Sequence, residues 1–147
     1  MKFEIRQISS KETGPLRHKI LRPTQDFRMT RYSGDDLQDA FHMGAFLENR
    51  MIGTASIYRE DFEDQKNGWR IRGMAIEEDY RGRGVGQKLL HSLIAHSKNN
   101  QGNYIWFNAR TPAVGFYEKS GFEKVGSEFE LPEIGPHFVM KMDLNKG

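Results

Sequence analysis

The apolar positions in the first third of the chain predict a strand followed by a helix. Residues 3–8 alternate between apolar and polar side chains, which is the pattern of a half-buried strand. Further on, Leu16 and Ile20 have the spacing of one helix face, and Pro23 ends this pattern because its ring does not fit a helix interior. Residues 24–36 are mostly polar and finish in a glycine turn, so they predict a loop.

Two alternating segments in the middle of the chain predict a β-hairpin. Residues 40–46 and 51–58 each have the period of a strand, and a short polar stretch separates them. His42 lies on the first of these strands, where a histidine is more often a packed residue than a catalyst. Residues 59–68 carry charges of both signs, so they predict an exposed hairpin tip that leads into the next strand.

The period of the pattern changes after the next strand. Residues 69–76 alternate as in a strand with one buried face. Val85, Leu89 and Leu93 recur every four residues with polar residues between them, which predicts an amphipathic helix. The glycine-rich turn of residues 81–86 joins the two elements.

A further strand is predicted after this helix. Gly102 is expected to close the helix as its C′ residue, and the aromatic run of residues 104–107 predicts the strand. A strand, a crossover helix and a second strand of these lengths imply parallel pairing with a right-handed connection. A ligand of such a unit is expected at the carboxyl ends of the two strands, beside the glycine turn.

The last part of the chain predicts a short helix and two strands. Thr111 is expected to be the N-cap, Pro112 the first helical residue and Gly121 the residue that ends the helix. Residues 122–129 and 137–143 then form the two final strands.

The glycines at positions 82, 84 and 86 predict an anion site. Without Cβ atoms, successive N–H groups can turn inward, and the following helix adds its own unpaired N–H groups and the positive end of its dipole. Phosphate is the most natural ligand for such a turn. The spacing matches neither the dinucleotide fingerprint nor the Walker loop. Taken alone, the turn is also compatible with a strand-to-helix connection that binds no ligand.

Two segments of the chain resemble the signatures of the GNAT superfamily of N-acyltransferases. The first is Arg81-x-x-Gly84-x-Gly86, which in that family binds the pyrophosphate of coenzyme A through main-chain amides. The second runs from Asn108 to Phe122 and resembles the segment that holds the pantetheine arm. The two signatures occur in the right order, which makes the pair more specific than either one alone.

This resemblance implies a fold and a reaction. The fold is α/β (α+β), with a single mixed, mostly antiparallel sheet, a central parallel strand pair and helices on both faces, and residues 1–147 form one domain. The reaction is transfer of an acetyl group from acetyl-CoA to a primary amine. Direct attack by the amine is expected, because the chain has neither cysteine nor a Gly-x-Ser-x-Gly elbow to form an acyl-enzyme. A non-catalytic acyl-CoA sensor is the alternative, against which the presence of Asn108 and Tyr117 argues.

The resemblance also implies roles for individual residues. A backbone N–H of residues 74–76 would polarise the thioester oxygen, and Tyr117 would protonate the departing thiolate unless it is a structural tyrosine. The general base is open between Glu77, which has the family-like position, and His137, whose residue type has an ordinary pKa closer to neutral. Either could act through water or not at all, and Glu77 could instead belong to a solvated turn. The residues expected to bind coenzyme A are Met74, Ala75, Ile76, Arg81, Gly82, Arg83, Gly84, Val85, Gly86, Asn108 and Phe116.

The composition limits the partners, the metals and the compartment that we expect for this enzyme. The 147 residues include 22 basic and 20 acidic side chains, which give a formal net charge of +2, and no cysteine. Such interspersed charge gives no reason to expect a nucleic-acid partner, and without thiolates no metal is expected. No stretch approaches the roughly 18 apolar residues of a membrane span. We therefore expect a cytoplasmic enzyme, monomeric or homodimeric, without a membrane partner.

The acceptor is not identified by the sequence. A small molecule, a peptide and an antibiotic all remain open. The resemblance places the loop of residues 24–36 beside the acceptor, so that Phe27, Met29 and Tyr32 either line the acceptor pocket or pack under the loop.

Overall fold

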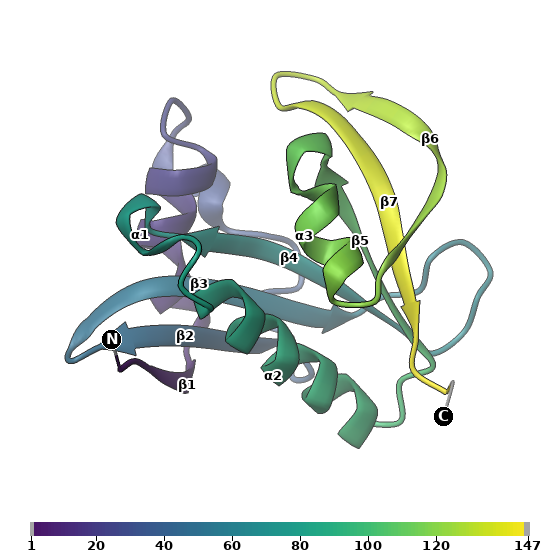
Figure 1. Cartoon of the computed structure of the whole chain (residues 1–147), viewed down its shortest axis with the longest axis horizontal. Helices are drawn as coiled ribbons and strands as arrows, with labels where there is room; N and C mark the ends of the chain where they lie inside the picture. The colour runs from purple at the N-terminus through teal and green to yellow at the C-terminus, as the bar shows by residue number, and fades with distance from the viewer. Residues whose placement is uncertain (1, 146–147) are drawn as a thin grey trace. The chain divides into compact units, whose positions relative to one another are not determined.

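Seven strands form one mixed sheet in the computed structural model, which describes residues 2–145 (Figure 1). Their order across the sheet is β1-β2-β3-β4-β5-β7-β6. The pairs β1–β2, β2–β3, β5–β7 and β6–β7 are antiparallel, whereas β4 and β5 are parallel. The predicted mixed sheet with a central parallel pair is therefore confirmed. The strands are β1 (Glu4–Ile8), β2 (Phe41–Leu47), β3 (Arg50–Arg59), β4 (Gly68–Ile76), β5 (Tyr104–Arg110), β6 (Glu123–Leu131) and β7 (Gly135–Asp143).

Most of the helical segments are short. The region predicted as one helix after β1 consists of three successive pieces with different hydrogen-bonding patterns. Pro15 explains the first break, because it has no N–H to donate and fits only the first turn of a new helix. The segments are η1 (Ser10–Thr13), α1 (Gly14–Leu16), the π-helical η2 (Arg17–Leu21), η3 (Phe27–Thr30), η4 (Glu78–Tyr80), α2 (Val85–Asn99), η5 (Thr111–Ala113) and α3 (Val114–Lys119).

The chain divides into two compact units, and neither is continuous in sequence. The first unit contains the residues up to Arg59 together with Ile71–His96. The second contains Glu60–Arg70 and the residues from Ser97 onward. The parallel pairing of β4 with β5 involves Gly68–Arg70 and lies within the second unit.

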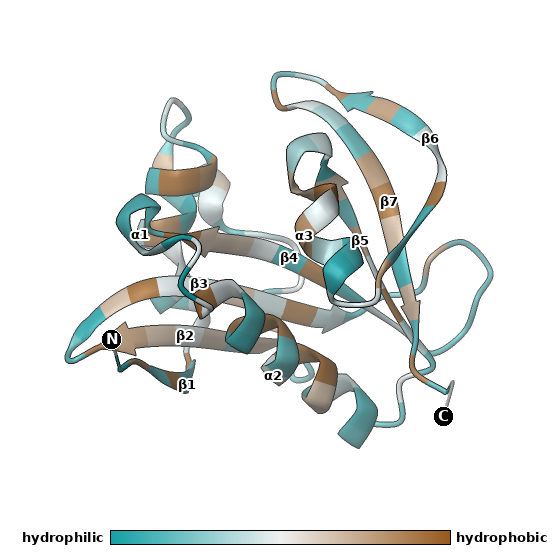
Figure 2. Cartoon of the chain, viewed as in Figure 1, coloured by the Kyte–Doolittle hydropathy of each residue, from teal (hydrophilic) through white to brown (hydrophobic). Residues whose placement is uncertain are grey.

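In the first unit, helical segments cover both faces of β3. A Cβ on Gly53 would lie 3.0 Å from Val85 and 3.2 Å from Leu89, so this face of β3 packs on α2. Ser56 points to the opposite face, because side chains alternate along a strand, and its hydroxyl accepts a hydrogen bond from Arg17 of η2 (3.0 Å). Figure 2 shows hydrophobic and hydrophilic bands alternating along α2, as expected of an amphipathic helix. The prediction of helices on both faces holds within this unit.

In the second unit, two aromatic residues of β5 form hydrogen bonds with the segment that follows β3. The hydroxyl of Tyr104 donates to the carbonyl of Gln65 (2.5 Å) and accepts from the N–H of Phe62 (2.7 Å). Trp106 donates from its indole Nε1 to the carbonyl of Glu60 (2.8 Å). The segment predicted as an exposed hairpin tip is therefore tied to β5 through its backbone.

The prediction that Gly102 is the C′ residue of α2 is wrong. The residue in the left-handed conformation is Gln101, with a φ of 60°. Gly102 is required for a different reason, since a Cβ there would lie 2.5 Å from Cδ1 of Trp69. The glycine thus provides room for an indole ring.

The prediction of Thr111 as the N-cap of the short helix after β5 is also wrong. Arg110 takes the N-cap position of η5, and the hydroxyl of Thr111 donates to Glu128 instead (2.8 Å). At the other end Gly121 ends α3 as predicted, with a φ of 100° that favours glycine.

Candidate functional site

The predicted anion loop lies in the first unit, between η4 and α2. Gly82 and Gly84 have φ values of 75° and 86°, in the left-handed region that favours glycine. A Cβ at either position would meet nothing within 4 Å, so glycine is needed here for backbone conformation rather than for space within the protein. From Arg81 to Gly84 every residue is exposed, while Val85 is buried as the first residue of α2. The loop therefore presents an accessible backbone at a helix N-terminus.

Arg81 and Arg83 flank these glycines. Arg81 donates from Nε to the carbonyl of Ile76 (3.3 Å), which links the loop to the end of β4. The guanidinium of Arg83 lies 5.9 Å from the ring centre of Tyr80. With both arginines beside the N-terminus of α2, the loop is positively charged, and it can hold a phosphate.

Strand β4 is irregular where the thioester is expected. Gly73 has a φ of 70°, which no regular strand contains. A Cβ on Gly73 would lie 2.8 Å from Nε of Arg17 and 3.3 Å from the ring of Tyr32. Ala75 is buried, and Met74 and Ile76 are half-buried. The predicted polarising segment thus follows directly after a glycine that interrupts the strand.

Glu77 is neither exposed nor part of a solvated turn. Its side chain accepts from Nζ of Lys19 (2.7 Å) and from Nη2 of Arg50 (3.0 Å), and the residue is only 7% exposed. The hydrogen bond from Lys19, helped by that from Arg50, lowers the pKa of Glu77 even though burial acts in the opposite direction. Glu77 is therefore held as a carboxylate between two cations.

Tyr117 lies in the second unit within a group of aromatic rings. Its ring centre is 4.5 Å from that of Phe107, 5.1 Å from that of Phe116 and 6.2 Å from that of Phe122. Burial raises the pKa of Tyr117 to about 12, so the phenol keeps its proton near neutral pH. Asn108, on β5, is half-buried and lies opposite Val139 of β7.

His137 is a buried residue of β7. It lies opposite Arg110 of β5 and Phe129 of β6. Its Nδ1 is 2.8 Å from the carbonyl oxygen of Gly135. Because a carbonyl only accepts, Nδ1 carries a hydrogen, and in the neutral ring Nε2 carries the lone pair.

The predicted site residues therefore form two groups, one in each unit. The first unit holds the glycine loop, residues 74–76 and Glu77. The second holds Asn108, Phe116, Tyr117 and His137.

Sequence reasoning missed a buried polar network in the first unit. Arg17 is fully buried and forms a double hydrogen bond with Asp35 through Nη1 (2.7 Å) and Nη2 (3.1 Å). The hydroxyl of Tyr58 also donates to Asp35. His42 lies between Oγ of Ser56, at 2.6 Å from Nδ1, and the carbonyl of Asp35, at 2.9 Å from Nε2. This confirms His42 as a packed residue.

Two members of this network have shifted pKa values. Burial alone would raise the pKa of Asp35, but the hydrogen bonds from Arg17, Tyr58 and the N–H of Tyr32 outweigh it and leave that pKa below the usual range. Burial lowers the pKa of His42. The folded protein therefore favours a charged Asp35 and a neutral His42. No signal in the sequence separates these polar residues from solvated ones.

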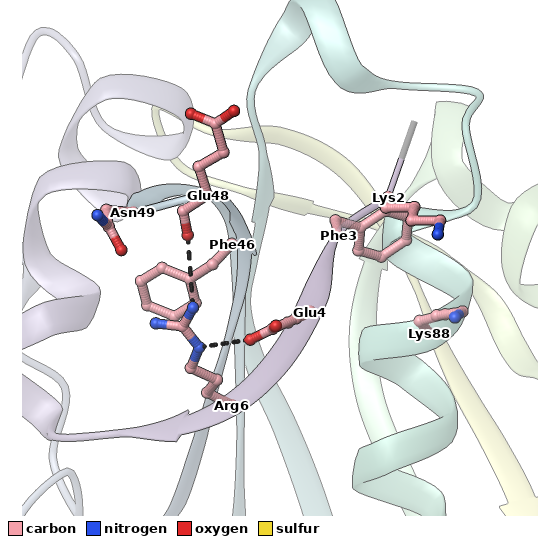
Figure 3. Close-up of a pocket in the computed structure, with 8 residues that line it drawn as sticks. All are labelled: Lys2, Phe3, Glu4, Arg6, Phe46, Glu48, Asn49 and Lys88. Atoms are coloured by element: carbon pink, nitrogen blue, oxygen red, sulfur yellow. Dashed lines mark hydrogen bonds and ion pairs between the residues drawn. The ribbon is translucent and has the colours of Figure 1, made fainter.

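An open pocket of about 570 Å³ lies elsewhere in the first unit (Figure 3). Arg6 stacks on Phe46 at 4.5 Å, and Nζ of Lys88 lies 5.4 Å from the ring centre of Phe3. The pocket contains none of the predicted site residues and mixes charges of both signs. Its lining residues are Lys2, Phe3, Glu4, Arg6, Phe46, Glu48, Asn49 and Lys88.

Two kinds of site are absent from residues 2–145. Within this range no three His, Cys, Asp or Glu side chains are grouped so that they could hold a metal ion. None of the helices described there is long and apolar enough to cross a membrane.

Comparisons with known proteins agree on one family. Residues 4–122 match the model of the acetyltransferase (GNAT) family. The chain is 33% identical over 140 residues to the uncharacterized N-acetyltransferase YitI of Bacillus subtilis, covering 94% of each chain. It is 32% identical over 107 residues to the spermine/spermidine N(1)-acetyltransferase of the same organism, covering 67% of this chain and 68% of the other. The crystal structure of Escherichia coli ElaA has the same fold, with a TM-score of 0.79, 18% identity and coverage of 96% of this chain and 99% of that one.

Proposed function

We propose that the acceptor amine attacks bound acetyl-CoA directly, since this chain belongs to the acetyltransferase (GNAT) family. The chain is an acyl-CoA-dependent N-acetyltransferase, as its family and its relatives show. In the proposed step the amine lone pair forms a bond to the thioester carbon. The C–S bond then breaks, the thiolate takes up a proton, and the new amide nitrogen loses one. Catalysis of this kind depends mainly on positioning the two substrates.

The observation that carries this proposal is the glycine loop at the start of α2. Gly82 and Gly84 are held in a conformation that favours glycine, and their surroundings are open to a ligand. The amides of this loop and of the first turn of α2 would bind the pyrophosphate of acetyl-CoA, and Arg81 and Arg83 would add positive charge. Asn108 and Phe116 would hold the pantetheine arm.

Polarisation of the thioester is assigned to the backbone of β4. An N–H of residues 74–76 would donate to the carbonyl oxygen as negative charge develops on it. The irregular backbone at Gly73 supports this assignment, because a left-handed residue interrupts the regular hydrogen-bond pattern of the strand directly before these residues.

Tyr117 is assigned to the departing sulfur. The phenol is neutral near pH 7, as an ordinary tyrosine is, and burial raises its pKa further, to about 12. A thiol has an ordinary pKa of about 8.5, so complete proton transfer from this phenol to the thiolate is unfavourable. Tyr117 therefore contributes chiefly a hydrogen bond that strengthens as charge builds on the sulfur.

His137 is the better candidate for the base. Glu77 accepts from Lys19 and Arg50, and its lowered pKa makes it a weak base. His137 has its Nδ1 fixed on the carbonyl of Gly135, which leaves the lone pair of Nε2 to accept a proton.

The proposal is tested by thiol release from acetyl-CoA in the presence of a panel of primary amines. We expect thiol release that depends on the amine and mass spectra that show a monoacetylated product. Thiol release at the same rate without any amine would indicate hydrolysis and contradict the proposed transfer. The base is tested separately with His137→Gln and Glu77→Gln, since only loss of the true base removes the acidic limb of the pH–rate profile.

A further inference from the structure

Three guanidinium groups surround one aromatic ring in the first unit. The Cζ atoms of Arg17 and Arg72 lie 4.1 and 4.3 Å from the ring centre of Tyr32, and that of Arg22 lies 5.7 Å away. Arg17 lies in η2, Arg72 lies in β4, and Arg22 is the C-cap residue of η2. The electron-rich ring attracts each cation, but it does not neutralise their charges.

The charge of Arg17 is matched by the network already described. Arg17 is fully buried against Asp35. Arg22 donates from Nη1 to a neutral group, the side-chain oxygen of Gln25 (3.0 Å), and its buried Nε has no hydrogen-bond partner within residues 2–145. Arg22 therefore brings a positive charge and a donor that an anion could satisfy.

This arginine group lies beside the part of β4 to which the reaction is assigned. A Cβ on Gly73 would be 3.3 Å from the ring of Tyr32. Gly73 directly precedes the segment whose N–H would polarise the thioester. An amine that attacks a carbonyl held there must itself lie close to β4 at this point, and the rest of the acceptor then lies within reach of Tyr32.

We infer that the acceptor carries a carboxylate, which Arg22 and Arg72 bind beside Tyr32, and that the enzyme acts on an amino acid or a short peptide. This inference rests on the proposed acetyl transfer. Guanidinium groups bind carboxylates in a planar, often bidentate geometry. A polyamine would instead add positive charge to a place where three guanidinium groups already gather.

Matched acceptors test the inference. Each L-amino acid is compared with its C-terminal amide, in which a neutral carboxamide replaces the carboxylate, and spermidine serves as a polycation. We expect the best amino acid to exceed its amide at least 30-fold in kcat/KM. Equal or faster acetylation of the amide, or a preference for spermidine, would overturn the inference and leave the proposed acetyl transfer intact.

Three variants locate the charge that is recognised. Arg22→Gln and Arg72→Gln should each lower the ratio of acid to amide at least 10-fold, mainly through KM for the acid, while turnover of the amide persists as evidence of a folded enzyme. Arg28→Gln is the matched control, because this arginine is 89% exposed and pairs with Asp26. An unchanged ratio in both test variants, or an equal loss in Arg28→Gln, would refute the assigned site.

A binding measurement separates this inference from the proposed function. The N-acetyl derivative of the best amino acid is the expected product, and calorimetry with it requires no turnover. If none of the amines releases thiol, the N-acetyl derivatives of alanine and glutamate serve as probes, each against the corresponding amide. The acid should bind more tightly than the amide, and Arg22→Gln should remove the difference. If no amine is acetylated but the acid still binds more tightly than the amide, the result counts against the acetyl transfer alone. If the acid and the amide bind equally, the result counts against the arginine site.

Discussion

At the scale of single residues, burial fixes the chemistry that a side chain can perform. Tyr117 lies among Phe107, Phe116 and Phe122, and the burial raises its pKa to about 12, so its hydroxyl keeps a hydrogen to donate over a wide pH range. Glu77 has the opposite character, since two cations stabilise its charged form. The sequence indicated both positions but could not separate their states, which depend on neighbours such as Lys19 and Arg50 that are far from Glu77 along the chain.

Tyr117→Phe removes the hydroxyl and keeps the ring. We expect kcat to fall about 10- to 1000-fold with little change in KM for acetyl-CoA, because the hydrogen bond to sulfur forms in the transition state. Steady-state kinetics measure both constants, and a thermal melt confirms that the variant is folded. Parental turnover would make Tyr117 structural.

Gly84→Val is expected to abolish binding of coenzyme A. Valine disfavours the left-handed backbone at this position and adds bulk where the ligand would lie. Gly126→Val is a matched control, because Gly126 also has a positive φ (75°, against 86° at Gly84) and open surroundings but lies on β6. Calorimetry should show loss of binding in the first variant only. Equal affinity in the two would refute the loop assignment.

At the scale of elements, the strands could be predicted well from the sequence, but the polar contacts between elements could not. The hairpin appears as β2 and β3 because alternation is a local property of strands. The region from η1 to η2 is less regular than predicted, since Pro15 interrupts its hydrogen bonds. The ion pair of Arg17 with Asp35 joins a helical segment to a loop, and no local pattern marks such a contact.

Asp35→Asn should destabilise the protein by about 3–5 kcal/mol, because it leaves the buried charge of Arg17 uncompensated. Urea unfolding followed by circular dichroism gives this difference. Asp26→Asn is the control, since Asp26 pairs with Arg28 at the surface and its removal should change stability little. Similar urea midpoints for the two variants would show that the buried pair does not anchor the loop.

At the scale of the whole molecule, one buried and one half-buried histidine link stability to pH. The pKa values of His42 and His96 are lowered from 6.5 by burial. As the pH falls through 6.5, the unfolded chain therefore takes up protons before the folded protein does. The contribution of these residues to stability is complete above pH 6.5 and is lost as the pH falls toward their folded pKa values.

We therefore expect the free energy of unfolding to be lower at pH 5.5 than at pH 7.5. Denaturant unfolding at a series of pH values measures the slope, and His42→Gln should reduce it without abolishing it, because His96 remains. A slope in His42→Gln equal to that of the parent would show that His42 does not contribute.

The interleaving of the two units determines the order in which they can form on the ribosome. The residues up to Arg59 emerge first, but their unit lacks Ile71–His96 until the second half of β4 and most of α2 have been made. Glu60–Arg70 leave the ribosome before that and must wait for the chain from Ser97 onward. At about 5–20 residues per second, these segments stay without partners for seconds. For the same reason, no single proteolytic cut can release two complete units.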